Sequence, residues 1–379
     1  MKSARLMFCV AAIVSALSGC GPSHNCVDDC EANAQKKNPT GDAQAIADAC
    51  ENECFKKMGG PEDTASSSQA IAPVTSCTLP SPATVTPTTI IFRGSGSSAV
   101  KLDLYFPPSG VTPLGSWAIG WHEGGFTSTG TTRNTCSSPP CNTVTACQMA
   151  ASLGVACASA DYTPATSSGG QFPAGLKDAL CATRWMRAHV GSRGLDPQRG
   201  IVFGFSAGGN FAEMIGYLLA AGYTVPGSGI GNVLPNGTDL TDASCPTAPS
   251  VADATMIKGI GPWYAPATLY PCSVVNGNCA TVTNLLTYFG ISTFSDPSYM
   301  PKALDASPSS LPHPAAGVAI SLAHGSSDIV VWPSESTNFD ASDTNVETGL
   351  GHMFAPTLNN TANCTILGQA PAASLFLSI

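Results

Sequence analysis

Charged side chains are scarce in this sequence. Only 16 Lys and Arg and 25 Asp and Glu occur among 379 residues, and the net charge is −9. Basic residues never cluster beyond an adjacent pair, so no surface is expected that would neutralise a run of phosphates. This composition argues against a nucleic-acid partner.

Long apolar runs are also missing. No stretch approaches the roughly 18 uninterrupted apolar residues of a transmembrane helix. The apolar run at 6–17 follows Lys2 and Arg5, and residues 1–19 are therefore predicted to be a signal peptide. The boundary LSGC, ending at Cys20, resembles the lipobox of bacterial lipoproteins. This resemblance implies export, lipidation of Cys20 and a lipid anchor to the cell envelope, at the outer membrane or cell surface. The alternative is an ordinary cleaved signal and a periplasmic or secreted protein.

Cysteine, by contrast, is abundant, with 16 residues. Without Cys9 in the signal and Cys20 at the lipid site, an even number of fourteen remains. So many cysteines are typical of an oxidising compartment, where they pair as disulfides.

Residues 20–58 are predicted to form a small helical hairpin stapled by disulfides. Two Cys-x3-Cys pairs flank an Asn-Pro-Thr-Gly turn, and the pattern resembles twin CX3C helical hairpins. Antiparallel folding favours the nested pairs Cys26–Cys54 and Cys30–Cys50, and a four-thiolate metal site is the alternative.

Residues 59–87, rich in Gly, Pro, Ser and Thr, are predicted to be a linker. Short loops further on suggest the pairs Cys136–Cys141 and Cys272–Cys279, and six cysteines stay unassigned: Cys77, Cys147, Cys157, Cys181, Cys245 and Cys364.

From residue 88 to residue 379 the pattern predicts one α/β domain. Residues 88–94 and 100–107 alternate apolar and polar side chains, as half-buried strands do. Short apolar runs then alternate with helical segments, the clearest being 172–190 and 207–222, which indicates a mainly parallel sheet with helices on both faces. The apolar runs are 116–122, 154–162, 200–205, 256–264 and 317–325. In such sheets the chemistry lies at the carboxyl ends of the strands.

The motif Gly204-Phe205-Ser206-Ala207-Gly208 matches G-x-S-x-G. It directly follows an apolar strand and opens a helix, which is the context that a nucleophilic serine on a sharp turn requires. Some 80 residues earlier, Gly124 and Gly125 follow another strand. Their backbone N–H groups, with that of Ala207, are candidates for an oxyanion hole, and an ordinary glycine turn is the alternative.

Taken together, these segments resemble the α/β-hydrolase superfamily, specifically the HGGG-motif carboxylesterases of the hormone-sensitive-lipase-like and feruloyl-esterase-like type. The resemblance spans roughly residues 88–379 and implies an α/β-hydrolase fold. One departure is Glu123, which stands where the first glycine of HGGG would be. The segments that carry the resemblance are His122-Glu123-Gly124-Gly125-Phe126, Asp161-Tyr162-Thr163-Pro164, Phe172-Pro173-Ala174, Lys177-Asp178-Ala179, Arg184-Trp185, Gly204 to Asn210, and His324-Gly325-Ser326-Ser327-Asp328.

The order expected on this fold is serine, acid, histidine. His352 lies in a glycine-flanked loop after a strand-like segment and is the predicted general base, whereas His313 and His324 are interpreted as structural, His324 as a brace of its loop. Asp328 holds the acid position, with Asp340 and Asp343 as alternatives that we interpret as solvated or capping residues.

The remaining notable side chains receive simpler interpretations. Phe126, Trp263 and Tyr264 are candidates to line the substrate pocket, with a buried wall as an equal alternative for the last two. Asp161 and Tyr162 are expected to support the wall of the site, and Asp296 and Asp305 to shape turns. The charged residues Lys177, Asp178, Arg184 and Arg187 share one helix and are expected to form a solvated face.

The sequence thus predicts a serine carboxylic ester hydrolase that needs no metal or organic cofactor. Resemblance implies short-acyl esters or acetyl and feruloyl esters on polysaccharides. A serine peptidase of the same fold is one alternative, and a catalytically inactive surface-binding protein is another. No protein partner is indicated.

Overall fold

The structure, a computed structural model, divides into two units at residues 1–70 and 71–379. The predicted hairpin at 20–58 lies outside the described residues except for residue 36, and so do Cys20 and both disulfides predicted for the hairpin. The predicted linker up to residue 83 also lies outside them, as do Cys136–Cys141, Cys272–Cys279, Cys77 and Cys364. The described residues are 36, 84–128, 130–135, 142–220, 232–245, 256–269, 282–314, 318–339, 344–347 and 352.

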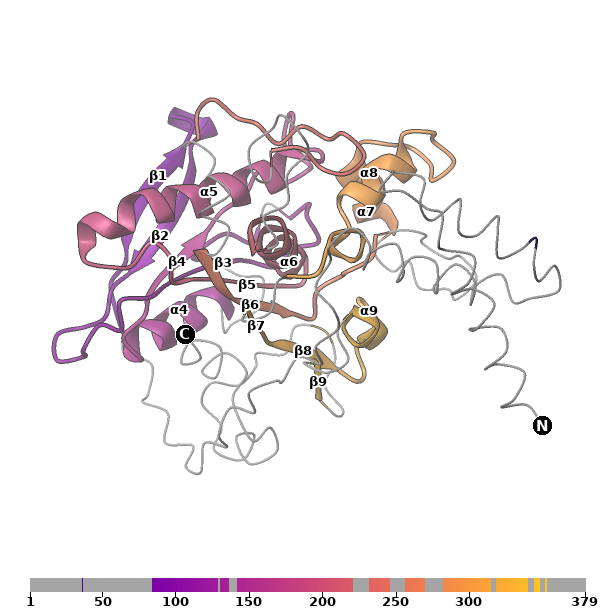
Figure 1. The fold of residues 1–379 in the computed structure, drawn as a ribbon. Helices are drawn as coiled ribbons and strands as arrows, with labels where there is room; N and C mark the ends of the chain where they lie inside the picture. The colour runs from indigo at the N-terminus through magenta and orange to yellow at the C-terminus, as the bar shows by residue number, and fades with distance from the viewer. Residues whose placement is uncertain are drawn as a thin grey trace, which may run out of the picture. The chain divides into compact units, whose positions relative to one another are not determined.

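A single sheet organises the described part of the second unit (Figure 1). Its strand order is β1-β2-β4-β3-β5-β6-β8-β9, and the short β7 pairs with β6. The pairs β1–β2 and β2–β4 are antiparallel and every later pair is parallel. The predicted mainly parallel sheet is therefore confirmed. The strands are β1 (Thr88–Arg93), β2 (Val100–Tyr105), β3 (Trp117–Trp121), β4 (Ala156–Ala160), β5 (Gly200–Phe205), β6 (Ile257–Trp263), β7 (Ala319–Ile320), β8 (Leu322–Gly325) and β9 (Thr344–Glu347).

Helices cover both faces of this sheet. Figure 1 shows α5 and α4 on opposite sides of the strands. Consecutive side chains of a strand point to opposite faces, so a strand buried on both faces needs apolar residues at every position. In β5, Val202 packs into one core cluster, whereas Ile201 and Phe203 pack into the other. The helices are α4 (Asn142–Ser152), α5 (Ala174–Val190), α6 (Ala207–Ala220), α7 (Val282–Phe289), α8 (Tyr299–Asp305) and α9 (Pro333–Phe339), with 3₁₀ turns η2 (Gly96–Ser98), η3 (Gly191–Arg193) and η6 (Pro308–Ser310).

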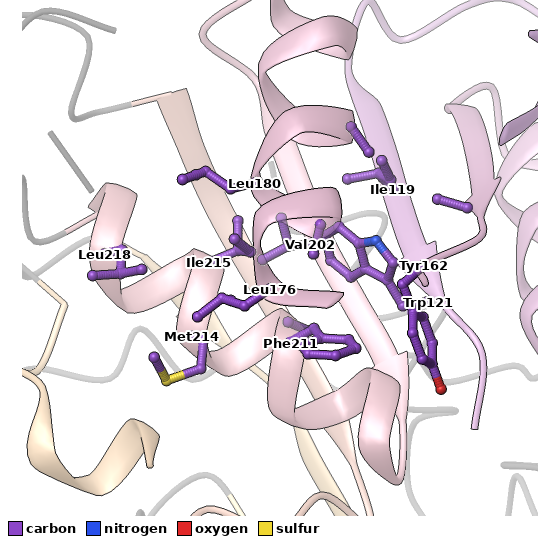
Figure 2. Close-up of a cluster of buried hydrophobic side chains, with 14 of the residues drawn as sticks. Ile119, Trp121, Tyr162, Leu176, Leu180, Val202, Phe211, Met214, Ile215 and Leu218 are labelled. Atoms are coloured by element: carbon purple, nitrogen blue, oxygen red, sulfur yellow. The ribbon is translucent and has the colours of Figure 1, made fainter. Parts of the chain in front are cut away.

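The larger core cluster fills the space between the sheet and helices α5 and α6. Figure 2 shows Ile119 and Val202 from the strands facing Leu176 and Phe211 from the helices. All four side chains are buried. This packing holds the start of α6, and with it Ser206, against the end of the sheet. No helix of the described residues is long and apolar enough to cross a membrane.

One expectation for α5 is wrong. Asp178 and Arg184 do not face solvent but are buried. Asp178 forms an ion pair with Arg93 at the end of β1 and accepts a hydrogen bond of 2.7 Å from the Thr163 N–H. The Arg184 Nη2 donates to Asn232 at 2.8 Å. The local pattern of the helix does not show this burial, because the partners of both charges lie on other elements, far away in the sequence.

Two disulfides occur among the described residues, and both join cysteines that the sequence left unassigned. Cys147 on α4 pairs with Cys157 on β4, and Cys181 on α5 pairs with Cys245. The second bridge closes a separation of 64 residues. It therefore ties the segment 232–245 to α5.

Candidate active site

Ser206 lies on the turn between β5 and α6, where the chain is strained. Its φ is 51°, in the left-handed region that non-glycine residues rarely occupy, and its N–H donates to the Trp263 carbonyl at 3.0 Å. A Cβ atom at Gly204 or Gly208 would overlap backbone atoms, in the second case the Trp121 carbonyl. The turn therefore needs glycine on both sides of the serine, as the motif predicts.

His352 links this serine to a carboxylate. Its Nε2 lies 3.0 Å from the Ser206 Oγ, and its Nδ1 lies 2.7 Å from the Asp328 Oδ2. Because an ionised carboxylate only accepts hydrogen bonds, Nδ1 carries the proton and Nε2 presents its lone pair to the serine hydroxyl. The ring also packs edge-on against Tyr264, with centroids 4.9 Å apart. The three side chains singled out in the sequence thus form one hydrogen-bonded series.

Asp328, in the loop after β8, is held in its ionised form. Burial by itself would raise its pKa, but hydrogen bonds from His324 and His352 and from the Val331 N–H together hold the pKa well below its usual range. Its Oδ1 accepts from the N–H groups of Val330 and Val331 at 2.8 and 3.0 Å. A carboxylate fixed in this way can orient an imidazole and stabilise its positive charge.

His324 provides a second imidazole on the same carboxylate. Its Nε2 lies 3.2 Å from the Asp328 Oδ2 and 2.8 Å from the Val331 carbonyl, while Nδ1 lies 2.8 Å from the Ser336 hydroxyl. Both neighbours of Nε2 are acceptors, so this nitrogen carries a proton. The sequence suggested a brace for the loop. It did not reveal that this brace touches the acid, although the spacing of four residues was the available signal.

The glycine loop after β3 folds beside the start of α6. Gly124 and Gly125 have φ values of 133° and 59°, and the Gly124 carbonyl accepts from the N–H groups of Thr127 and Ser128. No backbone hydrogen bond of the described residues uses the N–H of Gly124 or Gly125. These donors are therefore available for a substrate oxygen.

Two aromatic rings support this loop from behind. The His122 Nδ1 lies 2.7 Å from the Glu123 carbonyl, and the Tyr162 hydroxyl donates to the same carbonyl at 3.4 Å. The two rings stack with centroids 4.4 Å apart. Glu123 itself is buried, and burial raises the pKa of its carboxyl, an effect partly offset by its own N–H and by nearby His352. The departure from HGGG therefore places an additional buried acid near the imidazole, which sequence reasoning missed.

The candidate pocket residues are all buried. Phe126 stacks on Tyr288 with centroids 4.2 Å apart. Trp263 has no exposed surface and packs against Phe205, so it lies in the wall behind the site. Tyr264 is buried as well, and its contact with the His352 ring makes it part of the same wall. A role of these residues in substrate binding stays a prediction.

The other titratable residues take structural positions. Asp161 binds the Arg133 side chain at 2.8 Å, and Asp296 accepts from the Ser298 N–H. Asp305 is buried and accepts from the N–H groups of residues 236 and 238, so it anchors a distant segment as well as ending α8. His313 packs edge-on against Tyr217. Asp340 and Asp343 lie outside the described residues. Among the described residues no group of three or more His, Cys, Asp or Glu is arranged to hold a metal ion.

A mostly parallel sheet between helical layers, with a serine on a strained turn at the carboxyl end of a central strand, is the architecture of the α/β-hydrolase fold. The family model BD-FAE matches residues 102–342, and the chain belongs to this family. The matched range includes Ser206 and Asp328, and His352 follows it. No curated protein was found to match the chain.

Solved structures of two esterases are similar in fold. A truncated carbohydrate esterase from gut microbiota is 17% identical, with a TM-score of 0.53 over 77% of this chain and 99% of that chain. A propionate-bound esterase from the Planctomycetes species Thermogutta terrifontis is also 17% identical, with a TM-score of 0.51 over 79% and 94%. At this identity the similarity concerns the fold alone.

Proposed function

We propose that this protein is a serine carboxylic ester hydrolase in which Ser206 is the nucleophile, His352 the general base and Asp328 the orienting acid. The observation that carries the proposal is the series of hydrogen bonds from the Ser206 Oγ through the His352 ring to Asp328, 3.0 and 2.7 Å long. Both distances lie within the reach that proton transfer requires.

In the proposed reaction the Ser206 oxygen attacks the acyl carbon while the His352 Nε2 takes the hydroxyl proton. The ester C–O bond of the tetrahedral intermediate then breaks, and the same proton passes to the leaving alcohol. A water molecule attacks the resulting acyl-enzyme with His352 again as base, which releases the acid and restores the serine. The low pKa of Asp328 keeps its charge available for the imidazolium formed in each half-reaction.

The developing oxyanion is assigned to backbone donors. We assign the N–H groups of Gly124, Gly125 and Ala207, because the first two are unused within the described residues and the third lies at the N-terminus of α6. Donors that are already oriented stabilise negative charge without reorganising during the reaction. The brace of His122 and Tyr162 on the Glu123 carbonyl would keep this loop in place.

The proposed substrates are short-acyl esters, including acetyl or feruloyl groups carried by polysaccharides. Membership of an esterase family supports the ester, and a carbohydrate esterase among the structural neighbours supports the polysaccharide. We further propose export and lipidation at Cys20, because a cell-surface anchor suits a polymer too large to be imported. Residues 20–58 would then be a spacer or docking module.

The nucleophile can be tested with the full chain and its Ser206→Ala variant. Turnover of nitrophenyl esters from acetate to palmitate, and of acetylated and feruloylated xylan, should fall in kcat by about 10⁴-fold or more with the fold retained. Ser192→Ala, an exposed serine outside the site, is the matched control and should be unaffected. Near-normal turnover by Ser206→Ala would refute the assignment.

A covalent probe separates the mechanism from the choice of substrate. A fluorophosphonate should label the wild-type chain once, on the peptide that contains Ser206, and should not label the alanine variant. Labelling of Ser206 without turnover of any ester would favour the alternative of a serine peptidase. The absence of both labelling and ester turnover would instead favour a catalytically inactive binding protein.

A further inference from the structure

A polar cleft of about 770 Å³ opens beside the candidate active site, and Ser206 does not line it. Its walls come from the ends of β1, β3 and β4, through Arg93, His122 and Asp161, and from the segment around Ser168. Both β3 and β4 end at the carboxyl edge of the sheet, the edge at which β5 ends just before Ser206. The volume is within the range of small-ligand sites, about 300–1,000 Å³.

The charges in this cleft are already paired within the protein. Arg93 forms ion pairs with Asp178 and Asp242, the second at 2.5 Å. Asp161 accepts from the Arg133 side chain at 2.8 Å and from the Arg133 N–H at 2.7 Å. An ionic ligand would have to compete with these partners, so the cleft favours a neutral one.

Several polar groups of the cleft nevertheless lack a partner. The His122 Nδ1 must carry a proton, because its neighbour is the Glu123 carbonyl, and burial lowers the pKa of His122 so that the ring stays neutral. Its Nε2 is therefore an acceptor, and no described residue donates to it. The hydroxyl of Thr131, which is only 3% exposed, also has no partner among the described residues, nor do those of Ser167 and Ser168.

We propose that this cleft binds a neutral, hydroxyl-rich ligand, namely a sugar unit of the glycan that carries the ester. This inference rests on the proposed ester hydrolysis for its substrate, but the binding itself does not depend on catalysis. A sugar offers hydroxyl donors to the His122 Nε2 and to Asp161, and both donors and acceptors to Thr131. An apolar group would leave these largely buried groups without a hydrogen-bond partner, and burying an unsatisfied polar group is unfavourable.

His122 connects the cleft to the proposed oxyanion loop. One nitrogen of its ring faces the Glu123 carbonyl, one residue before Gly124, and the other is open to the ligand. A hydroxyl bound at Nε2 therefore contacts the side chain that supports the glycine loop. The cleft and the proposed oxyanion loop therefore share the side chain of His122.

Binding is tested on the full-length Ser206→Ala chain with unesterified tetrasaccharides of xylose, glucose and mannose, using calorimetry. At least one of them should bind in a saturable manner. Ser168→Trp, which fills the cleft from an exposed position, should weaken that binding at least tenfold, and Thr131→Val should weaken it several-fold. Ser109→Trp is the matched control, since it introduces the same ring into an exposed turn after β2 at the opposite edge of the sheet.

Two results would overturn the proposal. One is the absence of saturable binding for all three neutral tetrasaccharides, and the other is equal binding by Ser168→Trp and Ser109→Trp. Stronger binding of a galacturonic acid oligomer than of every neutral sugar would refute the argument from paired charges.

Kinetics distinguish a failure of this inference from a failure of the proposed function. In an otherwise wild-type chain, Ser168→Trp should lower the ratio of kcat/KM on acetylated xylan to that on nitrophenyl acetate at least tenfold, and Ser109→Trp should not change it. No hydrolysis of either ester by the wild-type chain would refute the esterase proposal and leave the calorimetric test intact. Hydrolysis with an unchanged ratio would refute the sugar cleft alone.

Discussion

Glu213 on α6 is fully buried, and neither of its carboxyl oxygens has a hydrogen-bond partner among the described residues. Burial raises its pKa well above the usual value, and the neighbouring carboxyl of Glu335 adds to the shift. The folded protein therefore keeps a proton on Glu213 at pH values at which the unfolded chain, with a pKa of about 4.3, has released it. Stability must then fall as the pH rises.

The size of this effect follows from proton linkage. Between the unfolded-state pKa and the folded-state pKa, the free energy of unfolding falls by about 1.4 kcal/mol for each pH unit because the folded state binds one more proton. Glu213→Gln has nearly the same shape and cannot ionise. The variant should match the wild type near pH 4 to 5 and become progressively more stable than it at higher pH.

Urea unfolding of the full chain at intervals from pH 5 to pH 8 measures this difference directly. Glu335→Gln is the comparison variant. Burial raises the Glu335 pKa too, but the Thr268 N–H donates to its carboxylate at 2.8 Å, so its substitution should reduce the slope less. If the stability difference between Glu213→Gln and the wild type does not change with pH, the carboxyl is not buried and unpaired as described.

Three further outcomes are expected. His324→Gln should lower kcat on nitrophenyl acetate by about 10- to 100-fold with little change in KM, because a hydrogen bond to a charged carboxylate contributes about 1.5–3 kcal/mol. An equal change in kcat and KM would contradict a positioning role for His324. Gly208→Ala should lose activity and about 1–3 kcal/mol of stability, since the added Cβ would overlap the Trp121 carbonyl. A variant with full activity in kinetic assays and full stability in urea unfolding would be inconsistent with that close approach. Replacing Cys181 and Cys245 together by serine should lower the free energy of unfolding by about 4 kcal/mol, because the bridge reduces the entropy of the unfolded chain by closing a loop over a separation of 64 residues. An unchanged urea midpoint would argue against the bridge.

The sheet, and the hydrogen-bonded series of Ser206, His352 and Asp328, could be predicted because their signals are local. Buried parallel strands need apolar residues on both faces, so 200–205 was recognisable from six positions alone. Ser206 was recognisable because glycine must flank a strained turn, and Asp328 and His352 because each follows a strand. Chain connectivity then brings such loops to the same edge of the sheet.

What could not be predicted depends on partners far away in the sequence. Nothing near Asp178 shows that Arg93, 85 residues earlier, ends beside it. Cysteine spacing likewise gave no reason to join Cys181 to Cys245. The burial of Glu123 depends on how the glycine loop packs, which no local pattern reports.

The two disulfides also constrain how this protein can be produced. Thiols in a reducing cytosol are not oxidised, so chains made there would lack the covalent ties from α4 to β4 and from α5 to residue 245. Cys147 and Cys157 emerge only ten residues apart during synthesis, whereas Cys181 must wait for a further 64 residues before its partner exists. Expression hosts that provide both an oxidant and an isomerase should therefore give the highest recovery of correctly paired material.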